Sequence, residues 1–268
     1  MRRFRSAASR CSYLVSSAAS RQEQQDAEEF LSFLLELLHE LLRAPAQPKR
    51  QEEGRLQFEQ AEKWCLRQLK SYDPNDPRST DEVVAPRSII SLAIASGTGD
   101  QTLSDCLEHF RHPEQLTGEN RVYCDGYCRA KTTRLTQILL QRVPPVLILR
   151  LQRFKHTSLR GQTEKVDTPV SFPCGKDELL DITMNSFVRD KDKRVTFELV
   201  AVCAHIGCSI DSGHYVAYVR HQTPGQEEAS SNQWVRVDDD AVSMIDEAAF
   251  RNETLTSAYL LFYTQVTR

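Results

Sequence analysis

The 268-residue sequence lacks any long apolar run. Its longest mostly apolar segment, Val143 to Leu151, has the length of a strand, whereas a membrane-spanning helix needs roughly 20 residues. A strong charge of either sign is also missing, since the net charge is −3 and the isoelectric point is about 6.2. We therefore expect no membrane partner and no nucleic-acid partner, because a nucleic-acid site usually needs a basic face.

Internal repeats, low-complexity tracts and a secretory signal are absent as well. A hydrophobic content of 40% with 26% charged residues is typical of a globular protein, built as one large domain or as two closely packed parts. The eight cysteines are irregularly spaced for a chain of this length. This spacing favours reduced thiols in the cytoplasm or nucleus over a disulfide framework.

The first 21 residues contain five arginines and no acidic residue. That composition is typical of a mitochondrial presequence. The alternative, which we favour, is an irregular basic segment over residues 1–21, because a helix that resembles the middle of a domain follows directly. The sequence therefore predicts one domain over residues 22–268.

Helical spacing dominates the first part of this domain. Apolar residues recur at helical intervals from Ala27 to Leu42, after an N-cap at Asp26 with Glu29 three residues later. The pattern further predicts a second helix over residues 51–70, a proline-containing loop over 71–86, and a short helix from Leu103 to Phe110 after a cap at Thr102.

Strand patterns dominate the second part, which makes the fold class α+β. The predicted strands are Ser88–Ala95, Val146–Leu151, Phe197–His205 and Tyr259–Val266. In the third of these, the alternation places Phe197, Leu199, Ala201 and Cys203 on one face.

One predicted hairpin brings together residues with catalytic chemistry. If residues 215–221 pair antiparallel with residues 233–237, His214 falls opposite the acidic residues Asp238 to Asp240. An imidazole beside a carboxylate is the base and its orienting partner in many nucleophilic enzymes. The alternative is a hydrogen-bonded surface pair without a catalytic role.

Five segments, in this order along the chain, resemble the ubiquitin-specific proteases. They are Gln24-Gln-Asp-Ala-Glu-Glu-Phe-Leu31, Val143-Pro-Pro-Val-Leu147 with Leu151-Gln-Arg-Phe154, Gly213-His-Tyr-Val-Ala-Tyr218, Trp234-Val-Arg-Val-Asp-Asp239 and Ala258-Tyr-Leu-Leu-Phe-Tyr263. The resemblance implies a papain-like cysteine peptidase with fingers, palm and thumb, which cleaves after the C-terminal glycine of ubiquitin. It places the thumb at about residues 22–70, the fingers at about 83–142 and the palm at about 143–268.

The resemblance also implies roles for individual residues. His214 would be the general base, Asp238 its orienting partner, and Asp239 a further functional carboxylate. Asp26 and Tyr215 would contact the basic tail of ubiquitin. A helix N-cap alone is the other interpretation of Asp26, and the two roles are compatible.

The sequence departs from the family at the nucleophile. The family's box of the form Asn-x-Gly-Asn-Thr-Cys is not present, although Ser9 to Leu14 resembles it superficially around Cys11. We interpret Cys11 as a bystander, so the nucleophile is unassigned and the thumb is expected to be incomplete. The apolar face of the first helix, with Phe30, Leu34, Leu38 and Leu41, should then be exposed.

A second departure concerns zinc, which many family members bind through two Cys-x-x-Cys pairs in the fingers. Here Cys124 and Cys128 are one residue too far apart, and Cys65 is the one cysteine upstream near the right place. Cys106, His109 and His112 could supply ligands, but their segment has the pattern of an ordinary helix end. Because a structural site needs four ligands, we expect no metal and no other cofactor.

Three functions are consistent with these patterns, and ubiquitin or ubiquitinated proteins are the expected partners in the first two. The first is thiol-dependent hydrolysis of ubiquitin conjugates, and the second is ubiquitin binding by a catalytically inactive pseudo-protease. The third is hydrolysis of another ubiquitin-like modifier.

Overall fold

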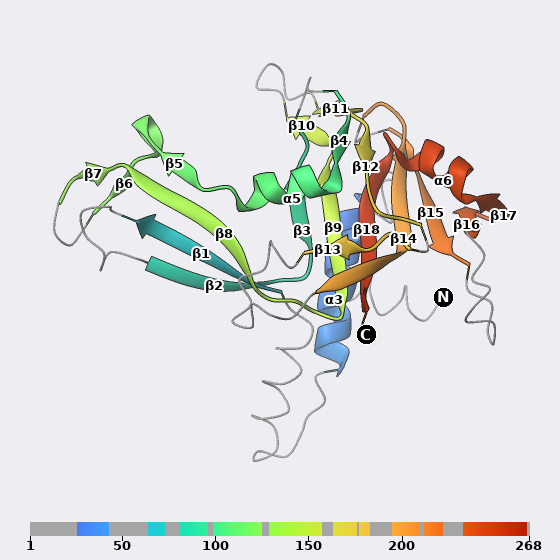
Figure 1. Ribbon diagram of the computed structural model, residues 1–268, viewed down its shortest axis with the longest axis horizontal. Helices are drawn as coiled ribbons and strands as arrows, with labels where there is room; N and C mark the ends of the chain where they lie inside the picture. The colour runs from blue at the N-terminus through green and yellow to red at the C-terminus, as the bar shows by residue number, and fades with distance from the viewer. Residues whose placement is uncertain are drawn as a thin grey trace, which may run out of the picture.

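An eight-stranded sheet forms the centre of the structure, and a four-stranded sheet extends to one side of it (Figure 1). The structure is a computed structural model that describes residues 26–42, 64–72, 81–95, 99–124, 129–156, 163–175, 177–182, 195–209, 212–221 and 233–266. In these ranges, no helix is long and apolar enough to cross a lipid bilayer.

The central sheet has the order β17-β16-β15-β14-β18-β9-β3, with β13 paired to β14 outside this path. Its neighbouring strands are antiparallel except for β3 and β9, which are parallel. The strands are β3 (Ile90–Ala93), β9 (Val146–Gln152), β13 (Leu180–Asp181), β14 (Thr196–Ile206), β15 (His214–Arg220), β16 (Gln233–Asp238), β17 (Ala241–Asp246) and β18 (Ala258–Val266).

The projecting sheet corrects two predictions. Its order is β2-β1-β8-β5, with β1 at Trp64–Tyr72, β2 at Asp81–Arg87, β5 at Glu114–Leu116 and β8 at Arg134–Arg142. The helix predicted over residues 51–70 is wrong from residue 64 onward. The loop predicted over 71–86 is wrong at residues 71–72, which belong to β1, and from residue 81 onward; residues 51–63 and 73–80 lie outside the described part. The pairing of β1 with β8, which is remote in sequence, decides the conformation, and Pro86 is tolerated because β2 is an edge strand.

Three short strand pairs and one 3₁₀ turn complete the β-structure. β4 is parallel to β12, whereas β6 with β7 and β10 with β11 form antiparallel hairpins. Their bounds are β4 (Gln101–Thr102), β6 (Val122–Tyr123), β7 (Lys131–Thr132), β10 (Phe154–His156), β11 (Thr163–Lys165), β12 (Val170–Ser171) and η1 (Gly118–Asn120).

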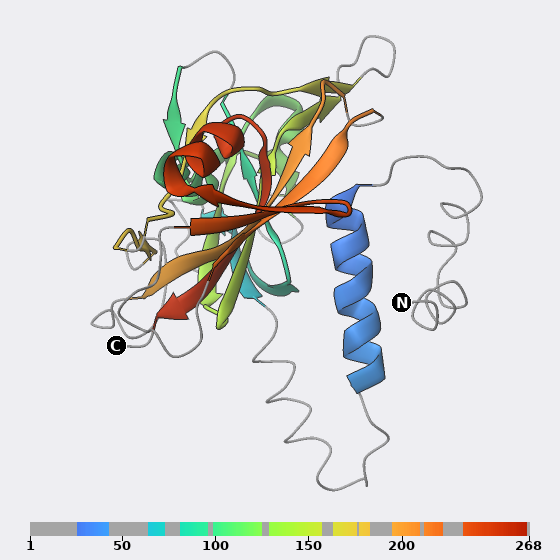
Figure 2. The same cartoon turned by 90° about the vertical axis from the view of Figure 1, so that its right-hand side faces the viewer.

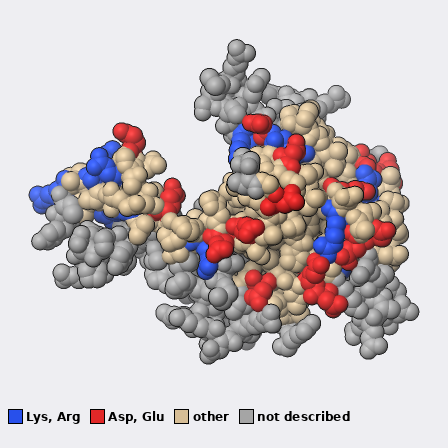
Figure 3. Space-filling view, turned by 45° about the horizontal axis from the view of Figure 1, so that its top comes forward, with Lys and Arg blue, Asp and Glu red and all other residues tan. Residues whose placement is uncertain are grey.

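Basic side chains gather on the projecting lobe (Figure 3), which carries Arg121, Arg129, Lys131 and Arg134.

Three α-helices are described: α3 (Ala27–Leu42), α5 (Leu103–Arg111) and α6 (Glu247–Thr254). Two of them begin as predicted. The backbone N–H of Glu28 donates to Asp26 Oδ1 (2.6 Å), and Thr102 forms a reciprocal capping box with Asp105. The third helix, α6, was not predicted and is capped by Asp246.

The first helix runs beside the central sheet (Figure 2). Phe30 is 54% exposed and Leu38 is 40% exposed, which confirms the predicted exposure at these two positions. Leu34 is partly buried, and the side chain of Leu41 lies outside the described part.

The buried positions of β14 depart from simple alternation of buried and exposed residues. Phe197 and Leu199 of β14 are fully buried, as predicted, but Val202 and Ala204 are buried in place of Ala201 and Cys203. The pairing of β14 with β18 shifts register between Leu199 and Ala201. A β-bulge of this kind turns the following residues to the opposite face.

A buried arginine joins three segments of the domain. Arg153 Nε donates to the carbonyl oxygen of Ala258 (2.6 Å), and its terminal nitrogens donate to the carbonyls of Val166, Thr168 and Leu255. Burial lowers the pKa of Arg153 to about 10. These bonds hold the start of β18 beside the end of β9.

Candidate active site

The hairpin formed by β15 and β16 has the predicted register. Ala217 faces Val237 and Arg220 faces Trp234 across antiparallel strands. Since alternate residues of a strand share a face, His214, at the start of β15, lies on the same face as Asp238, at the end of β16. The two strands therefore bring a base and a carboxylate to one edge of the sheet.

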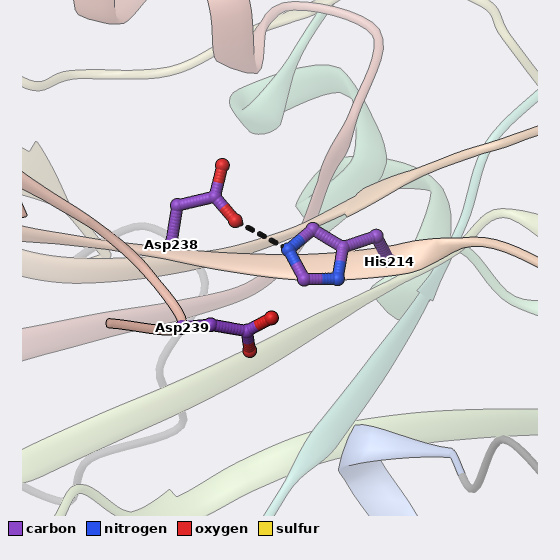
Figure 4. Close-up of side chains that lie close together, drawn as sticks. All are labelled: His214, Asp238 and Asp239. Atoms are coloured by element: carbon purple, nitrogen blue, oxygen red, sulfur yellow. Dashed lines mark hydrogen bonds and ion pairs between the residues drawn. The ribbon is translucent and has the colours of Figure 1, made fainter. Parts of the chain in front are cut away.

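The two side chains form a direct hydrogen bond, as predicted. His214 Nε2 lies 2.5 Å from Asp238 Oδ1, and both side chains are partly exposed (Figure 4). This hydrogen bond, together with the charge of Arg236, holds the pKa of the Asp238 carboxyl below its usual range. An ionised carboxylate can only accept, so Nε2 carries the proton and Nδ1 is left as the basic ring nitrogen.

Asp239 occupies the turn between β16 and β17. Its φ of 51° lies in the left-handed region, which aspartate tolerates better than most residues. Its carboxylate points to the same side as the His214 ring (Figure 4), and ligand-type atoms of the three residues lie within 4.8 Å of one another. The expected proximity of Asp239 to the pair is therefore confirmed.

These three residues also have the donor types of a metal site. They form the one group of three or more His, Cys, Asp and Glu residues in the described ranges that could hold an ion. Both oxygens of Asp238 already have partners, however: Oδ1 bonds to His214, and Oδ2 lies 2.8 Å from Arg236. These contacts fix the orientation of Asp238 beside the histidine base.

A second cluster lies around the start of α3. Tyr259 Oη donates to Asp26 Oδ2 (2.7 Å), and the Tyr259 and Tyr215 rings are 6.1 Å apart. Burial, reinforced by the negative charge of Asp26, raises the pKa of both phenols. Asp26 therefore caps the helix with one oxygen and binds a tyrosine of β18 with the other.

His205 forms the buried end of this cluster. It contacts Phe154 and Tyr215 edge to face, with ring centroids 5.0 Å apart in each case. It is fully buried, and neither ring nitrogen has a hydrogen-bond partner in the described structure. Burial and the charge of Lys165 lower its pKa, so the ring is neutral.

Three residues of these clusters were missed by sequence reasoning. Arg236 shares the face of Asp238 two residues away, so strand alternation contained a signal for it. Tyr259 was assigned to a strand but not to a site, and Glu253, which bonds to Arg236, lies on the unpredicted α6. Their roles depend on contacts between segments that are distant in sequence.

Three of the described cysteines have the opposite of an activated thiol. Burial raises the pKa of Cys106, that of Cys174 to about 12 and that of Cys203 to about 11. A nucleophilic cysteine needs the opposite shift. Cys124 lies in the projecting lobe and Cys208 is exposed in the turn after β14, whereas Cys11 lies outside the described residues.

The candidate zinc ligands are dispersed. Cys65 pairs with Arg142 at one end of β1, and Cys124 closes the β6–β7 hairpin beyond the other end. Cys106 is buried in the core on α5, where His109 and His112 form the helix end. Cys128 lies outside the described residues.

A mixed α+β domain with a His–Asp pair at the edge of its central sheet fits a hydrolase that uses a histidine base. The family model for ubiquitin carboxyl-terminal hydrolase matches residues 5–263, and the chain belongs to this family.

Relatives of known sequence agree with this assignment. Ubiquitin carboxyl-terminal hydrolase 48 of Danio rerio is 32% identical over 84% of this chain and 19% of its own length. Ubiquitin carboxyl-terminal hydrolase 2 of Rattus norvegicus is 31% identical over 90% of this chain and 39% of its own length. The chain thus spans well under half of these relatives.

The fold is also similar to solved structures. The SAGA Ubp8/Sgf11/Sus1/Sgf73 DUB module bound to ubiquitin aldehyde matches with a TM-score of 0.70 and 26% identity. The match covers 95% of this chain and 53% of the solved chain.

Proposed function

We propose that this chain binds the C-terminal tail of ubiquitin and provides the base for thiol-dependent hydrolysis of ubiquitin conjugates. The observation that carries the proposal is the hydrogen bond between His214 and Asp238, in a domain of this family. Asp238 fixes the ring orientation and stabilises the imidazolium that forms when the ring takes up a proton. Asp239 is proposed to assist as a nearby negative charge.

The two sheets are proposed to correspond to two parts of the family's architecture. We assign the central sheet to a palm and the projecting sheet to fingers, within a papain-like fold. The helix α3 is the described part of a thumb, which we expect to be incomplete. On this assignment β1 and β2 belong with the fingers, because they pair with each other and with β8.

The cluster around α3 is proposed as the site for the ubiquitin tail. Asp26 is partly exposed, and Glu28 and Glu29 follow it in the first turn. Asp26 and Glu29 beside Tyr215 and Tyr259 suit a basic, extended peptide, whereas Glu28 already pairs with Arg150 (2.7 Å). Asp26 retains this capacity while capping the helix, since each carboxylate oxygen can accept more than one hydrogen bond.

The chemistry assigned to the pair is a proton transfer through Nδ1. His214 would accept the proton of a thiol, whose sulfur would then attack the carbonyl carbon of the C-terminal glycine of ubiquitin. The same proton would pass to the leaving amine, and water would release the acyl group from sulfur. The nucleophile remains unassigned.

Ubiquitin binding without hydrolysis is the second candidate, and one observation favours it: the sequence lacks the family's nucleophile box. The first candidate predicts covalent capture of a ubiquitin probe that bears a C-terminal electrophile. The second predicts binding of ubiquitin, measured by calorimetry, without capture.

One experiment separates the candidates. The chain, Cys11→Ala and His214→Ala are incubated with the probe and analysed by intact-mass spectrometry, with calorimetry in parallel. Capture that is lost in His214→Ala supports hydrolysis, and its loss in Cys11→Ala would identify Cys11 as the nucleophile. Binding without capture supports the second candidate, whereas binding of another ubiquitin-like modifier in preference to ubiquitin would contradict both.

A further inference from the structure

The carboxylate of Asp238 is held at both of its oxygens. Oδ1 bonds to His214 Nε2 (2.5 Å), and Oδ2 forms an ion pair with the Arg236 guanidinium (2.8 Å). A carboxylate with one partner can rotate about its bond to Cβ, whereas two partners on opposite oxygens fix its plane. Arg236 therefore determines which oxygen faces the base.

Arg236 is itself held from the other side. Its Nε lies 3.3 Å from Glu253 Oε2, and Tyr218 Oη donates to the same oxygen (2.7 Å). Glu253 comes from α6, whereas Tyr218 and Arg236 face each other across β15 and β16. Three elements thus meet at this one guanidinium.

The end of this network lies in the core. Tyr218 is fully buried and packs edge to face on Phe250, with ring centroids 5.6 Å apart. Phe250 in turn stacks on Trp234 at 3.8 Å with an interplanar angle of 3°. Because closely packed side chains have little freedom to move, this stack gives the partly exposed pair a rigid reference point.

The network of Asp238, Arg236 and Glu253 also contains one more negative charge than positive charges. Arg236 alone would neutralise Asp238 and weaken its attraction for a protonated imidazole. Glu253 supplies a second negative charge against the same guanidinium. The set of Asp238, Arg236 and Glu253 therefore keeps a net negative charge beside His214.

We propose that Arg236 is a positioning residue for the catalytic pair and that Glu253 is its counter-charge. The proposal rests on the proposed function, since positioning matters only if His214 acts as a base. Arg236 does not touch the reacting atoms; it acts through Asp238 on the orientation and tautomer of His214. The alternative is that Arg236 forms only surface ion pairs with Asp238 and Glu253, and such pairs typically contribute little to stability.

Nuclear magnetic resonance tests the positioning without requiring hydrolysis. The chain is labelled with ¹⁵N-histidine, and two-bond ¹H–¹⁵N spectra report which ring nitrogen of His214 carries the proton, with His214→Ala used for assignment. We expect the Nε2–H tautomer in the wild type, and a mixture of tautomers in Arg236→Gln. Arg236→Lys should restore the wild-type pattern, because an ammonium group can also pair with Oδ2.

The matched control is Arg251→Gln. Arg251 is an arginine of α6 that pairs with Glu247 and Glu178 instead of Asp238. Its loss removes an arginine–glutamate network of the same kind and should leave the His214 tautomer unchanged. A wild-type tautomer in Arg236→Gln, or an equal change in Arg251→Gln, would overturn the proposal.

Steady-state hydrolysis of a ubiquitin C-terminal amide adds the kinetic signature. Arg236→Gln should lower kcat about 10- to 100-fold, in keeping with the cost of a misplaced catalytic group, with KM changed less than about twofold. Arg236→Lys should recover most of kcat. A wild-type chain without turnover would count against the proposed hydrolysis, while the tautomer measurement would still decide the positioning.

Discussion

The two faces of the β15–β16–β17 strands follow the same alternation but lie in different environments. On one face, α6 covers the sheet. Here Trp234, Tyr218 and Phe250 are fully buried, each with an exposed fraction of 0%. On the other face, Val219 is 45% exposed, Val242 66% and Met244 48%. The side chains that hold the catalytic pair all lie on the packed face.

This difference shows how the domain keeps a solvent-accessible base in place. His214 and Asp238 are partly exposed, as a reacting pair must be, but their supports lead into the buried stack of Trp234 and Phe250. The open face carries the smaller aliphatic side chains of Val219, Val242 and Met244 and gives no such support.

The largest expected effect is on the packed face. Phe250→Ala removes a ring that stacks on Trp234 and contacts Phe172 and Tyr218. We expect the free energy of unfolding to fall by about 3–5 kcal/mol, as is typical when a buried phenylalanine is truncated. Urea denaturation followed by tryptophan fluorescence and circular dichroism measures it. A loss below about 1 kcal/mol would show that α6 does not pack here as described.

The next largest loss of stability is expected in the turn between β14 and β15, directly before His214. A Cβ on Gly213 would overlap the buried ring of His205, so Gly213→Ala should cost about 1–3 kcal/mol of stability. A double-mutant cycle identifies the cause. In the presence of His205→Ala the cost of Gly213→Ala should be smaller but not zero, because the overlap with the ring is gone and that with the Ile206 carbonyl oxygen remains. Additive costs would exclude the overlap as the reason.

The sequence predicted local features of this site well. Hairpin register follows from alternation over a few residues, so the meeting of His214 and Asp238 could be inferred from two short segments. The caps at Asp26 and Thr102 were found for the same reason, since a cap needs only the next few residues. These features are determined within one turn or one hairpin.

Features set by distant contacts could not be predicted in this way. Residues 64–70 of β1 were mistaken for a helix because one of the two partners of this strand, β8, lies more than sixty residues away. The bulge after Leu199 depends on how β14 fits against β18. Likewise, alternation separates the two faces of β16 but does not show that α6 covers only one of them, so Arg236 and Glu253 were missed.

Alkaline pH should lower the free energy of unfolding, in part through Tyr218 and Cys203. Burial raises the pKa of Tyr218, on the packed face, to about 12, and that of Cys203, beside the α3 cluster, to about 11. A folded pKa above the unfolded value means that stability is fully present below the unfolded pKa and is lost as pH rises toward the folded one. The free energy of unfolding should therefore be flat near pH 7–8 and fall above about pH 9.

Variants assign this loss to the two groups. Each group contributes up to about 1.4 kcal/mol per pH unit between its two pKa values, discounted where solvent reaches it. Cys203→Ala should reduce the earlier part of the decline, to which Cys106 and Cys174 also contribute, and Tyr218→Phe should reduce the later part, in urea titrations at a series of pH values. A decline that is unchanged in both variants would contradict these assignments.

The smallest expected effect is on the open face. Val242 is the most exposed large apolar side chain in the described part of the molecule, so Val242→Ser should change the free energy of unfolding by less than about 0.5 kcal/mol. The contrast with Phe250→Ala, on the helix that covers the other face, is then at least sixfold. A loss above about 1.5 kcal/mol would mean that this face is covered in solution. Repeating the titration at two protein concentrations would identify the cover: a second copy makes the loss depend on concentration, whereas another part of the same chain does not.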